Sequence, residues 1–347
     1  MDTVPKLVII ADDLTGALDS SVAFAERGLK VVCALTPDQF EIAMAMNADI
    51  VAVSSGSREI PKDEAARRIA HVGAMIKTHD SVTGIRIFKK VDSRLKGHVA
   101  TEIQALGFEN DKILICPAIP RLGRFVKHGA LVGEGVSEPI NVAEISHLPQ
   151  SCCIEAWSQD DIERAIIAFA EDGLLVGAAG LAEATARQMV PVSLSKENVA
   201  PVAPALFAIG SRDPVTLAQL EAFSPLVAPN GQVPAPTSGS EDVQVIQMTP
   251  GETVISGQEA GRAFAEGIAE WIAEIRPSTF LACGGESAAE ICLRLNIGIL
   301  EVLGEVLPGL PMSRSAIGDE ELFVITKSGG FGGRDTLEMV SARLMKR

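Results

Sequence analysis

Two adjacent carboxylates follow the first apolar run of the chain. Asp12 and Asp13 come directly after Leu7–Ala11, and Leu14-Thr15-Gly16 follows them. Paired acids at a strand end are costly unless they bind a cation or a hydroxyl group, or act as a base. Asp13 or Thr15 could instead cap the next helix, because both residue types are good caps. We expect one of them to cap the helix and the pair to have a functional role.

Phosphatases of the haloacid-dehalogenase type offer a rival interpretation of these acids. Such an enzyme uses an Asp nucleophile and a second Asp two positions later. Here the acids are adjacent, and Leu14 occupies the second position after Asp12. The spacing disfavours that mechanism.

The densest polar cluster runs from Lys89 to His98, directly after another apolar strand. It reads Lys-Lys-Val-Asp-Ser-Arg-Leu-Lys-Gly-His, with four cations and one acid. Such a loop can hold an anionic substrate and a phosphoryl group in transit. A charged, solvated turn is the plainer alternative. We expect Lys90 and Arg94 to bind substrate, and Asp92 to be a second candidate base or metal ligand.

Arginines follow two further strand ends. Arg58 ends the segment Ser55-Gly56-Ser57-Arg58, and Arg124 follows Gly123 in a loop that Pro117 and Pro120 restrict. The planar guanidinium matches a carboxylate, so both arginines are candidate ligands of an acidic substrate. A solvated surface position explains Arg58 alone equally well.

Small residues mark three strand–helix junctions in the second half of the chain. Glycine lets backbone N–H groups face a phosphate, and a helix N-terminus favours negative charge. One such junction is weak evidence, but three on one sheet predict a nucleotide site. The junctions are Gly210-Ser211-Arg212-Asp213, Gly284-Gly285-Glu286-Ser287 and, after Lys327, Ser328-Gly329-Gly330-Phe331-Gly332-Gly333.

Several familiar nucleotide enzymes are excluded by their missing motifs. The chain has no GxxxxGK[ST], no GxGxxG after the first strand, and no HRD or DFG set. A P-loop enzyme, an ordinary NAD enzyme and a protein kinase are therefore disfavoured.

The alternation of short apolar strands with amphipathic helices predicts the α/β class, with mostly parallel sheets covered by helices. We expect the proline-rich residues 191–204 to link two domains, residues 1–190 and 205–347. Residues Ala228–Ser240 are rich in Pro, Gly and Ser and are predicted to be a loop. The helix over Gly257–Ile275 should bury Ala260, Phe264, Ile268, Trp271 and Ile272.

The bulk composition favours a cytoplasmic protein that acts on small molecules. Of the 347 residues 47% are hydrophobic, and the net charge is −15, which argues against nucleic-acid and membrane partners. The six cysteines form no metal-binding pattern and are expected to be reduced. No apolar stretch is long enough to cross a bilayer, and the N-terminal run is too short for a signal peptide.

Taken in order, these motifs resemble the four-carbon acid sugar kinase family, which was long catalogued as a domain of unknown function and includes D-threonate, D-erythronate and 3-oxo-tetronate kinases. The resemblance covers nearly the whole chain. It rests on Ala11–Gly16 with Asp19, Ser57-Arg58, Lys89–His98, Pro117–Arg124, Gly284–Ser287 and Lys327–Gly332.

The resemblance implies ATP-dependent phosphorylation of the terminal hydroxyl of a four-carbon sugar acid, with Mg²⁺ expected. It also implies that residues 1–190 bind the acid sugar and residues 205–347 bind the nucleotide, with the active site in the cleft between the two domains. The sequence does not identify the protein ligands of the metal, and either Asp13 or Asp92 could be the base. A homo-oligomer is compatible with the sequence. The implied acid-sugar residues are Asp12, Asp13, Ser57, Arg58, Asp92, Arg94 and Arg124. The implied nucleotide residues are Ser211, Gly284, Gly285, Glu286, Ser287 and Gly329 to Gly332, beside Lys327 and Ser328.

The chain departs from the family pattern at the proposed substrate loop. Arg94 and His98 stand where the family usually has Thr and Asn, and the chain is shorter than typical members. The departures bear on the identity of the sugar acid more than on the reaction type.

A non-catalytic ligand-binding protein is the alternative function, which the paired acids disfavour. An NAD(P)-dependent sugar-acid dehydrogenase is a weaker one, because acids occupy its glycine-rich turn.

Overall fold

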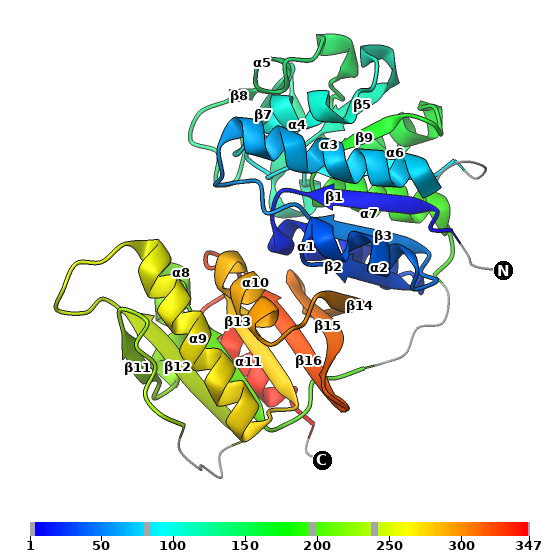
Figure 1. Cartoon of the computed structure of the whole chain (residues 1–347). Helices are drawn as coiled ribbons and strands as arrows, with labels where there is room; N and C mark the ends of the chain where they lie inside the picture. Colours follow the sequence, from blue (N-terminus) through cyan, green and yellow to red (C-terminus); the bar gives the residue numbers. More distant parts are fainter. Residues whose placement is uncertain (1–3, 80–83, 194–198, 237–241, 346–347) are drawn as a thin grey trace. The chain divides into compact units, whose positions relative to one another are not determined.

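The chain forms two compact units, residues 1–196 and 197–347, each a sheet covered by helices (Figure 1). The structure is a computed structural model, and it describes residues 4–79, 84–193, 199–236 and 242–345. Both units have mostly parallel strands with helices between them, which confirms the predicted α/β class.

Unit 1 contains a six-stranded parallel sheet. The strands are almost entirely buried, as expected for apolar runs covered by helices on both faces. In spatial order they are β2 (Val31–Ala34), β3 (Ile50–Ser54), β1 (Leu7–Ala11), β4 (Arg86–Lys90), β9 (Leu174–Gly177) and β5 (Ile113–Cys116).

The order of these strands creates a switch point between β1 and β4. From β1 the chain runs to β2 and β3 on one side, and it then crosses to β4 on the other. Right-handed crossovers therefore put α1 (Leu14–Ala25) and α3 (Lys62–His79) on opposite faces of the sheet. The helices α7 (Ala179–Met189) and α4 (Val99–Leu106) pack against α1 and α3 respectively. Ligands of open α/β sheets bind beyond the carboxyl ends of the strands at such a point.

A small lobe between β5 and β9 was not predicted. It consists of a three-stranded antiparallel sheet and a short helix, beside α6 (Gln159–Ala168). Its strands have two to four residues, too few for a period to be recognised in the sequence. Its elements are β6 (Arg124–Lys127), β7 (Ala130–Gly133), β8 (Ile140–Asn141) and α5 (Val142–Ser146); the remaining short helix of unit 1 is α2 (Phe40–Met44).

Unit 2 contains a seven-stranded sheet with a parallel and an antiparallel part. Its first five strands in spatial order are parallel, and the last three form an antiparallel meander that shares β16 with them. They are β11 (Leu226–Pro229), β12 (Val243–Thr249), β10 (Ala205–Ile209), β13 (Thr279–Cys283), β16 (Glu320–Lys327), β15 (Leu310–Ile317) and β14 (Ile299–Leu307).

Two predictions for unit 2 need correction. The strand β15 was missed, although its turns contain Gly309 and Gly318, both with positive φ. The predicted loop Ala228–Ser240 begins with the end of β11, which pairs with β12. Part of that loop, residues 237–240, lies outside the described residues.

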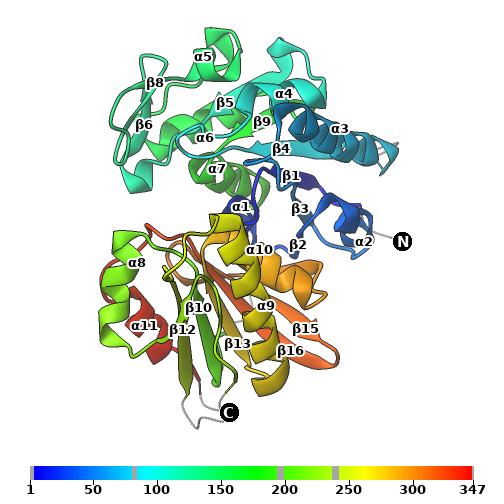
Figure 2. The same cartoon turned by 60° about the vertical axis from the view of Figure 1, so that its left-hand side comes forward.

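Four helices cover the sheet of unit 2 (Figure 2). The helix α9 (Gly257–Ile275) packs against α10 (Gly285–Arg294), and α8 (Pro214–Gln219) packs against α11 (Thr336–Ala342). The predicted core face of α9 is confirmed at its four large side chains, while Ala260 is only half-buried. The four are Phe264, Ile268, Trp271 and Ile272.

All six cysteines are buried and form no disulfide. Within the described ranges, no helix has both the length and the apolar character needed to span a bilayer.

Candidate functional site

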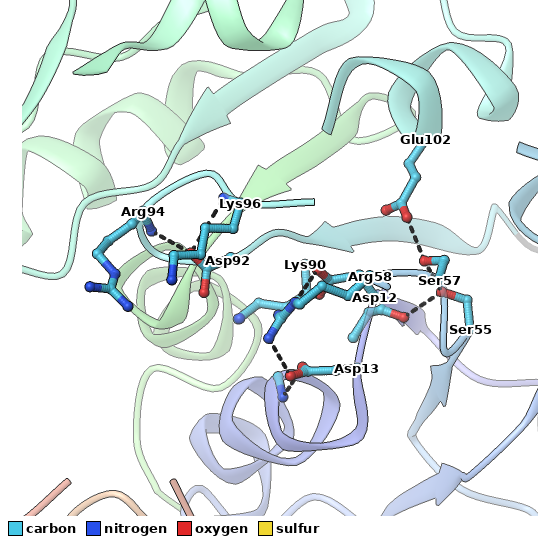
Figure 3. Close-up of polar contacts among 12 residues, drawn as sticks. Asp12, Asp13, Ser55, Ser57, Arg58, Lys90, Asp92, Arg94, Lys96 and Glu102 are labelled. Atoms are coloured by element: carbon cyan, nitrogen blue, oxygen red, sulfur yellow. Dashed lines mark hydrogen bonds and ion pairs between the residues drawn. The ribbon is translucent and has the colours of Figure 1, made fainter. Parts of the chain in front are cut away.

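The polar residues predicted in the first half of the chain gather at the switch point of unit 1 (Figure 3). Asp12 and Asp13 follow β1, Arg58 follows β3, and Lys90 ends the neighbouring β4. Strands β3, β1 and β4 are adjacent and parallel, so their carboxyl ends meet at one edge of the sheet.

Arg58 joins the two aspartates. Its Nε and Nη2 donate to the two carboxylate oxygens of Asp12 at 2.8 and 2.9 Å, and its Nη1 donates to Asp13 Oδ2 at 2.5 Å. The other oxygen of Asp13 accepts from the Gly16 N–H at 2.7 Å and caps α1, so the predicted cap is Asp13. The guanidinium is therefore matched by two carboxylates without any ligand, although binding of a substrate by Arg58 stays a prediction.

The two carboxyl groups have pKa values displaced in opposite directions. Burial pushes the pKa of Asp12 upwards, but the hydrogen bonds from Arg58 and the charges of Lys89, Arg58 and Lys90 bring it below its ordinary value. Burial also raises the pKa of Asp13, and there the charge of Asp12 adds to the rise, so the result lies above the ordinary value. Asp13 is also the more accessible, with 25% of its side chain exposed against 3% for Asp12. Opposite displacement within a pair of acids is typical of divided acid–base roles.

Lys90 is a buried cation with no hydrogen-bond partner among the described residues. It is only 5% exposed, and its ammonium lies close to Gly16, at the N-terminus of α1. A side chain on Gly16 would meet both Lys90 Nζ and Asp13 Oδ1, at 3.0 and 2.7 Å from its Cβ. A buried ammonium at the N-terminus of a helix favours an anion.

The loop after β4 is built around Asp92. One oxygen of its carboxylate accepts from the Arg94 N–H at 2.9 Å, and the loop turns through Leu95 with a φ of 57°. Arg94 is exposed, and its guanidinium has no hydrogen bond or ion pair to a described residue. The family departure at His98 faces away from this loop, because its ring bonds the carbonyl of Ile60 at 2.7 Å.

Arg124 supports the loop from the small lobe. Its Nη1 donates to Ser93 Oγ at 2.7 Å, and its Nε donates to the carbonyl of Glu134 at 2.8 Å. Gly123 precedes it with a φ of 69° and ends a short 3₁₀ turn, so its structural part is to shape the chain before β6. Neither residue contacts the aspartates through a hydrogen bond or ion pair.

Ser57 points into the protein instead of into the site. It is fully buried, and its hydroxyl donates to Glu102 on α4, which also pairs with Lys89. The sequence alone predicted no role for Glu102. A signal existed, since Glu102 falls on the buried face of α4 with Val99, Ile103 and Leu106, where a charge is unusual.

In unit 2 the three small-residue junctions converge. A side chain on Gly329 would lie 2.2 Å from Ser211 Oγ, and one on Gly210 would lie 2.4 Å from Ser287 Oγ. The glycines are therefore needed for the close approach of the loops that follow β10, β13 and β16. Gly284 has a φ of 114° and stands directly before Gly285, the first residue of α10. Together the loops offer backbone N–H groups and hydroxyls to an anion.

Lys327 was predicted at the nucleotide, but its ammonium is turned inward and is 1% exposed. It donates to Thr216 Oγ1 at 3.2 Å and to the carbonyls of Ser328 and Gly329 at 3.1 and 3.2 Å. Burial lowers the pKa of Lys327 below its ordinary value, against the pull of Cys283 and Asp213. It holds the glycine loop from inside, and its contact with a nucleotide stays a prediction.

Helix α8 contributes contacts to that loop which were not foreseen. Thr216 donates to the carbonyl of Gly329 at 2.5 Å, and Gln219 donates to the carbonyls of Phe331 and Gly333 at 3.0 and 2.7 Å. Gly332 lies against Thr336 at the start of α11. Glu286 falls in α10, and its side chain is outside the described part of the structure.

A metal ion would depend on few protein ligands. Among the residues the structure describes, no group of three or more His, Cys, Asp or Glu side chains is arranged around a metal position. Two carboxylates lie next to the glycine loop: an oxygen of Asp213 is 3.1 Å from the Cβ position of Gly330, and an oxygen of Asp335 is 3.0 Å from that of Gly333. This number suits Mg²⁺, which is usually held by one or two carboxylates together with phosphates and water.

Two protein families match the chain. The sugar-binding N-terminal domain family matches residues 7–152, and the nucleotide-binding C-terminal domain family matches residues 227–337. The first match contains the cluster of unit 1, and the second contains the junctions after β13 and β16.

Curated relatives cover nearly the full chain. A D-threonate kinase from Bordetella bronchiseptica is 27% identical over 99% of this chain and 98% of its own length. A 3-oxo-tetronate kinase from Pseudomonas fluorescens is 25% identical over 95% of each chain. Two solved structures share the fold. One, from Haemophilus influenzae, has a TM-score of 0.73 at 20% identity and covers 97% of this chain and 100% of its own. The other, from Salmonella typhimurium, has a TM-score of 0.76 at 17% identity and covers 97% of this chain and 98% of its own.

Removal of Arg58 tests the role of the guanidinium without any assay of activity. Arg58→Met leaves the buried Asp12 without its cation, and we expect it to lower the free energy of unfolding by about 3 kcal/mol at pH 7. Without the guanidinium the folded-state pKa of Asp12 rises, so the deficit relative to the wild type should shrink as the pH falls and the carboxyl is protonated.

Urea unfolding at pH 7 and pH 4.5 measures this difference. Arg187→Met is the matched control, because Arg187 forms an exposed ion pair with Glu163 in the same unit, and it should change stability by less than about 1 kcal/mol. Equal losses in the two variants would contradict the role given to Arg58.

Proposed function

Because the chain belongs to the four-carbon acid sugar kinase family, we propose that it transfers the γ-phosphoryl group of ATP to the terminal hydroxyl of a four-carbon sugar acid. Relatives named for D-threonate, 3-oxo-tetronate and D-erythronate support this substrate class. The observation that carries the proposal is the pair of different polar sites, each at the carboxyl ends of parallel strands: a cluster of acids and cations in unit 1, and a glycine-lined anion site in unit 2.

The nucleotide belongs to unit 2 in this proposal. The loops after β10, β13 and β16 would receive the phosphates through backbone N–H groups and the hydroxyls of Ser211 and Ser287. Their glycines permit the close approach that a larger side chain would block. We take residues 205–347 as the nucleotide domain, 1–190 as the acid-sugar domain and 191–204 as their connection.

Mg²⁺ would be held next to the nucleotide phosphates, with Asp213 as its protein ligand. The ion supplies neutralisation of the phosphate charge. The residues of this chain then have three tasks: to hold the two substrates, to accept the proton of the attacking hydroxyl, and to exclude water.

Asp13 fits the role of base better than Asp92. Its pKa is raised, its side chain is partly accessible, and its hydrogen bonds with Arg58 and Gly16 fix its orientation. Asp12 stays ionised and holds Arg58. Asp92 is engaged in the turn of its own loop. We therefore propose that Asp13 accepts the proton of the terminal hydroxyl as the oxygen attacks the γ-phosphorus.

The negative charge of the substrates needs cations that are not already paired. Arg58 is matched by Asp12 and Asp13, whereas Lys90 and Arg94 have no acidic partner within ion-pair distance in the described structure. We propose Lys90 as the principal cation for the bound anion next to Asp13, with the more exposed Arg94 as a second one. Transfer also requires a state in which the γ-phosphate and the hydroxyl meet, shielded from water.

The six reduced cysteines fit a cytoplasmic location, where ATP and a reducing environment are both available.

The substrate class is tested by coupled measurement of ADP release with ATP and Mg²⁺. Four-carbon sugar acids are compared with five- and six-carbon acids and with a reaction that lacks an acceptor. We expect a rate well above this background only with four-carbon acids. Background rates with every acid would refute the proposed acceptor class, and absence of ATP binding would refute the kinase activity itself.

The base is tested by Asp13→Asn. We expect kcat to fall by about 10²- to 10⁴-fold. The wild-type pH profile should lose activity as the pH drops and Asp13 is protonated, at a pH above the ordinary range of an aspartate because its pKa is raised. This limb should be missing in Asp13→Asn. If Asp92→Asn removes the limb and Asp13→Asn does not, the assignment is reversed.

The cation is tested by Lys90→Met, which keeps the length of the side chain but removes its charge. Loss of a charged hydrogen bond is worth about 1.5–3 kcal/mol, so kcat/KM for the sugar acid should fall by about ten- to a hundredfold. Calorimetric titration should give unchanged binding of ATP. Lys112→Met is the control, because Lys112 is an exposed surface cation paired with Asp172. Unchanged kcat/KM in Lys90→Met would exclude this role.

A further inference from the structure

Beneath the cluster of unit 1 lies a second set of polar residues that faces no solvent. Lys89, Glu102, Ser55 and Ser57 are each at most 1% exposed. They come from the end of β4, from α4 and from the segment after β3. None of the roles proposed above for binding or proton transfer uses Lys89, Glu102 or Ser55.

Glu102 is the centre of this buried network. One oxygen of its carboxylate pairs with Lys89 Nζ at 2.7 Å, and the other accepts a hydrogen bond from the hydroxyl of Ser57. The hydroxyls of Ser57 and Ser55 lie 2.8 Å apart, and Ser55 donates to the carbonyl of Ala11 at 2.8 Å. A continuous chain of polar contacts thus leads from α4 to the last residue of β1 (Figure 3).

Two branches of the network end next to residues of the cluster above it. Lys89 donates to the backbone carbonyl of its neighbour Lys90 at 2.8 Å. The Ser57 N–H donates to the carbonyl of Asp12 at 2.9 Å, and Arg58 is the next residue in the chain. Glu102 is therefore connected, through Lys89 and Ser57, to the backbone from which Asp12, Arg58 and Lys90 project.

Stability alone is a poor explanation for such a network. Burial of two opposite charges costs desolvation energy that their attraction repays only in part, and apolar residues of similar size often do as well or better. A buried and fully bonded polar network does, however, define one arrangement of the segments it joins. Positioning of the three strand ends is thus the function that its geometry supports.

We propose that Glu102 is a positioning residue for the acid-sugar site: through Lys89 and Ser57 it fixes Lys90 and the Asp12–Arg58 pair in the geometry that binds the sugar acid. The inference rests on the function proposed above. It makes no claim that Glu102 touches a substrate, and it concerns unit 1 only. Loss of the network should therefore act on the sugar acid and leave the nucleotide unaffected.

The test separates positioning from stability by removing one or both charges. Glu102→Leu leaves Lys89 buried without its partner and should lower the unfolding midpoint in urea. Lys89→Met combined with Glu102→Leu removes both charges and should regain most of that loss. Ser57 can then donate to Ser55, so no hydroxyl is orphaned. The double variant should still have a KM for the sugar acid raised by about ten- to a hundredfold, with the KM for ATP unchanged within about twofold.

Two further variants calibrate the result. Glu102→Gln keeps the shape and an acceptor for Ser57, so its KM should lie between those of the wild type and the double variant. Thr185→Val is the control for a buried polar-to-apolar change in the same unit, because Thr185 bonds only the carbonyl of Leu181 within α7. Its KM values should equal those of the wild type.

A double variant that regains both stability and the wild-type KM for the sugar acid would overturn the inference, because the pair would then be structural only. An inactive wild type in the same assay would instead refute the proposed function. In that event, a double-mutant cycle of Glu102→Leu and Arg58→Met, measured by urea unfolding, tests the network. Non-additive losses of stability would support its coupling to Arg58, and additive losses would refute it.

Discussion

The arrangement of unit 1 depends on how two carboxylates are kept side by side at the end of one buried strand. Asp12 is almost completely buried, and Asp13 stands next to it at the N-terminus of α1. Arg58 resolves the repulsion by binding both, and it must come from the neighbouring strand to do so. Because this cation is used for the acids, the charge available to a ligand has to come from β4. Lys90 lies on the other side of β1, and we propose that it supplies this charge.

The two units meet a similar requirement with different chemistry. Unit 1 concentrates side-chain charges at the switch point of its sheet, and these can distinguish a carboxylate from a hydroxyl. Unit 2 brings glycines together at three strand ends, and in the proposed function the backbone there receives the phosphates. Lys327 and α8 hold that backbone from inside through its carbonyls. A chain with a net charge of −15 can therefore bind anions, because the cations and N–H groups are placed locally.

The parts of the molecule that the sequence could predict are those with a local signal. The residue types at strand ends such as Ala11-Asp12-Asp13 and at the glycine junctions predict both a local structure and a kind of chemistry. Contacts between distant segments carry no such signal. The pairing of Arg58 with both aspartates, the inward turn of Lys327 and the link from Glu102 to Ser57 depend on how the sheet brings these residues together. The short strands of the β6–β8 lobe and β15 were missed because their length or composition shows no clear period.

In the proposed mechanism Arg58 stays with its two aspartates while Lys90 receives the substrate anion. A crystal structure with a four-carbon sugar acid and a non-hydrolysable ATP analogue tests it most directly. We expect the sugar acid between Asp13 and Lys90 with the Arg58–Asp12 pair intact, and the phosphates of the analogue against Ser211, Gly284 and Gly329. A sugar acid that draws Arg58 away from Asp12, or that leaves Lys90 without a ligand, would contradict it.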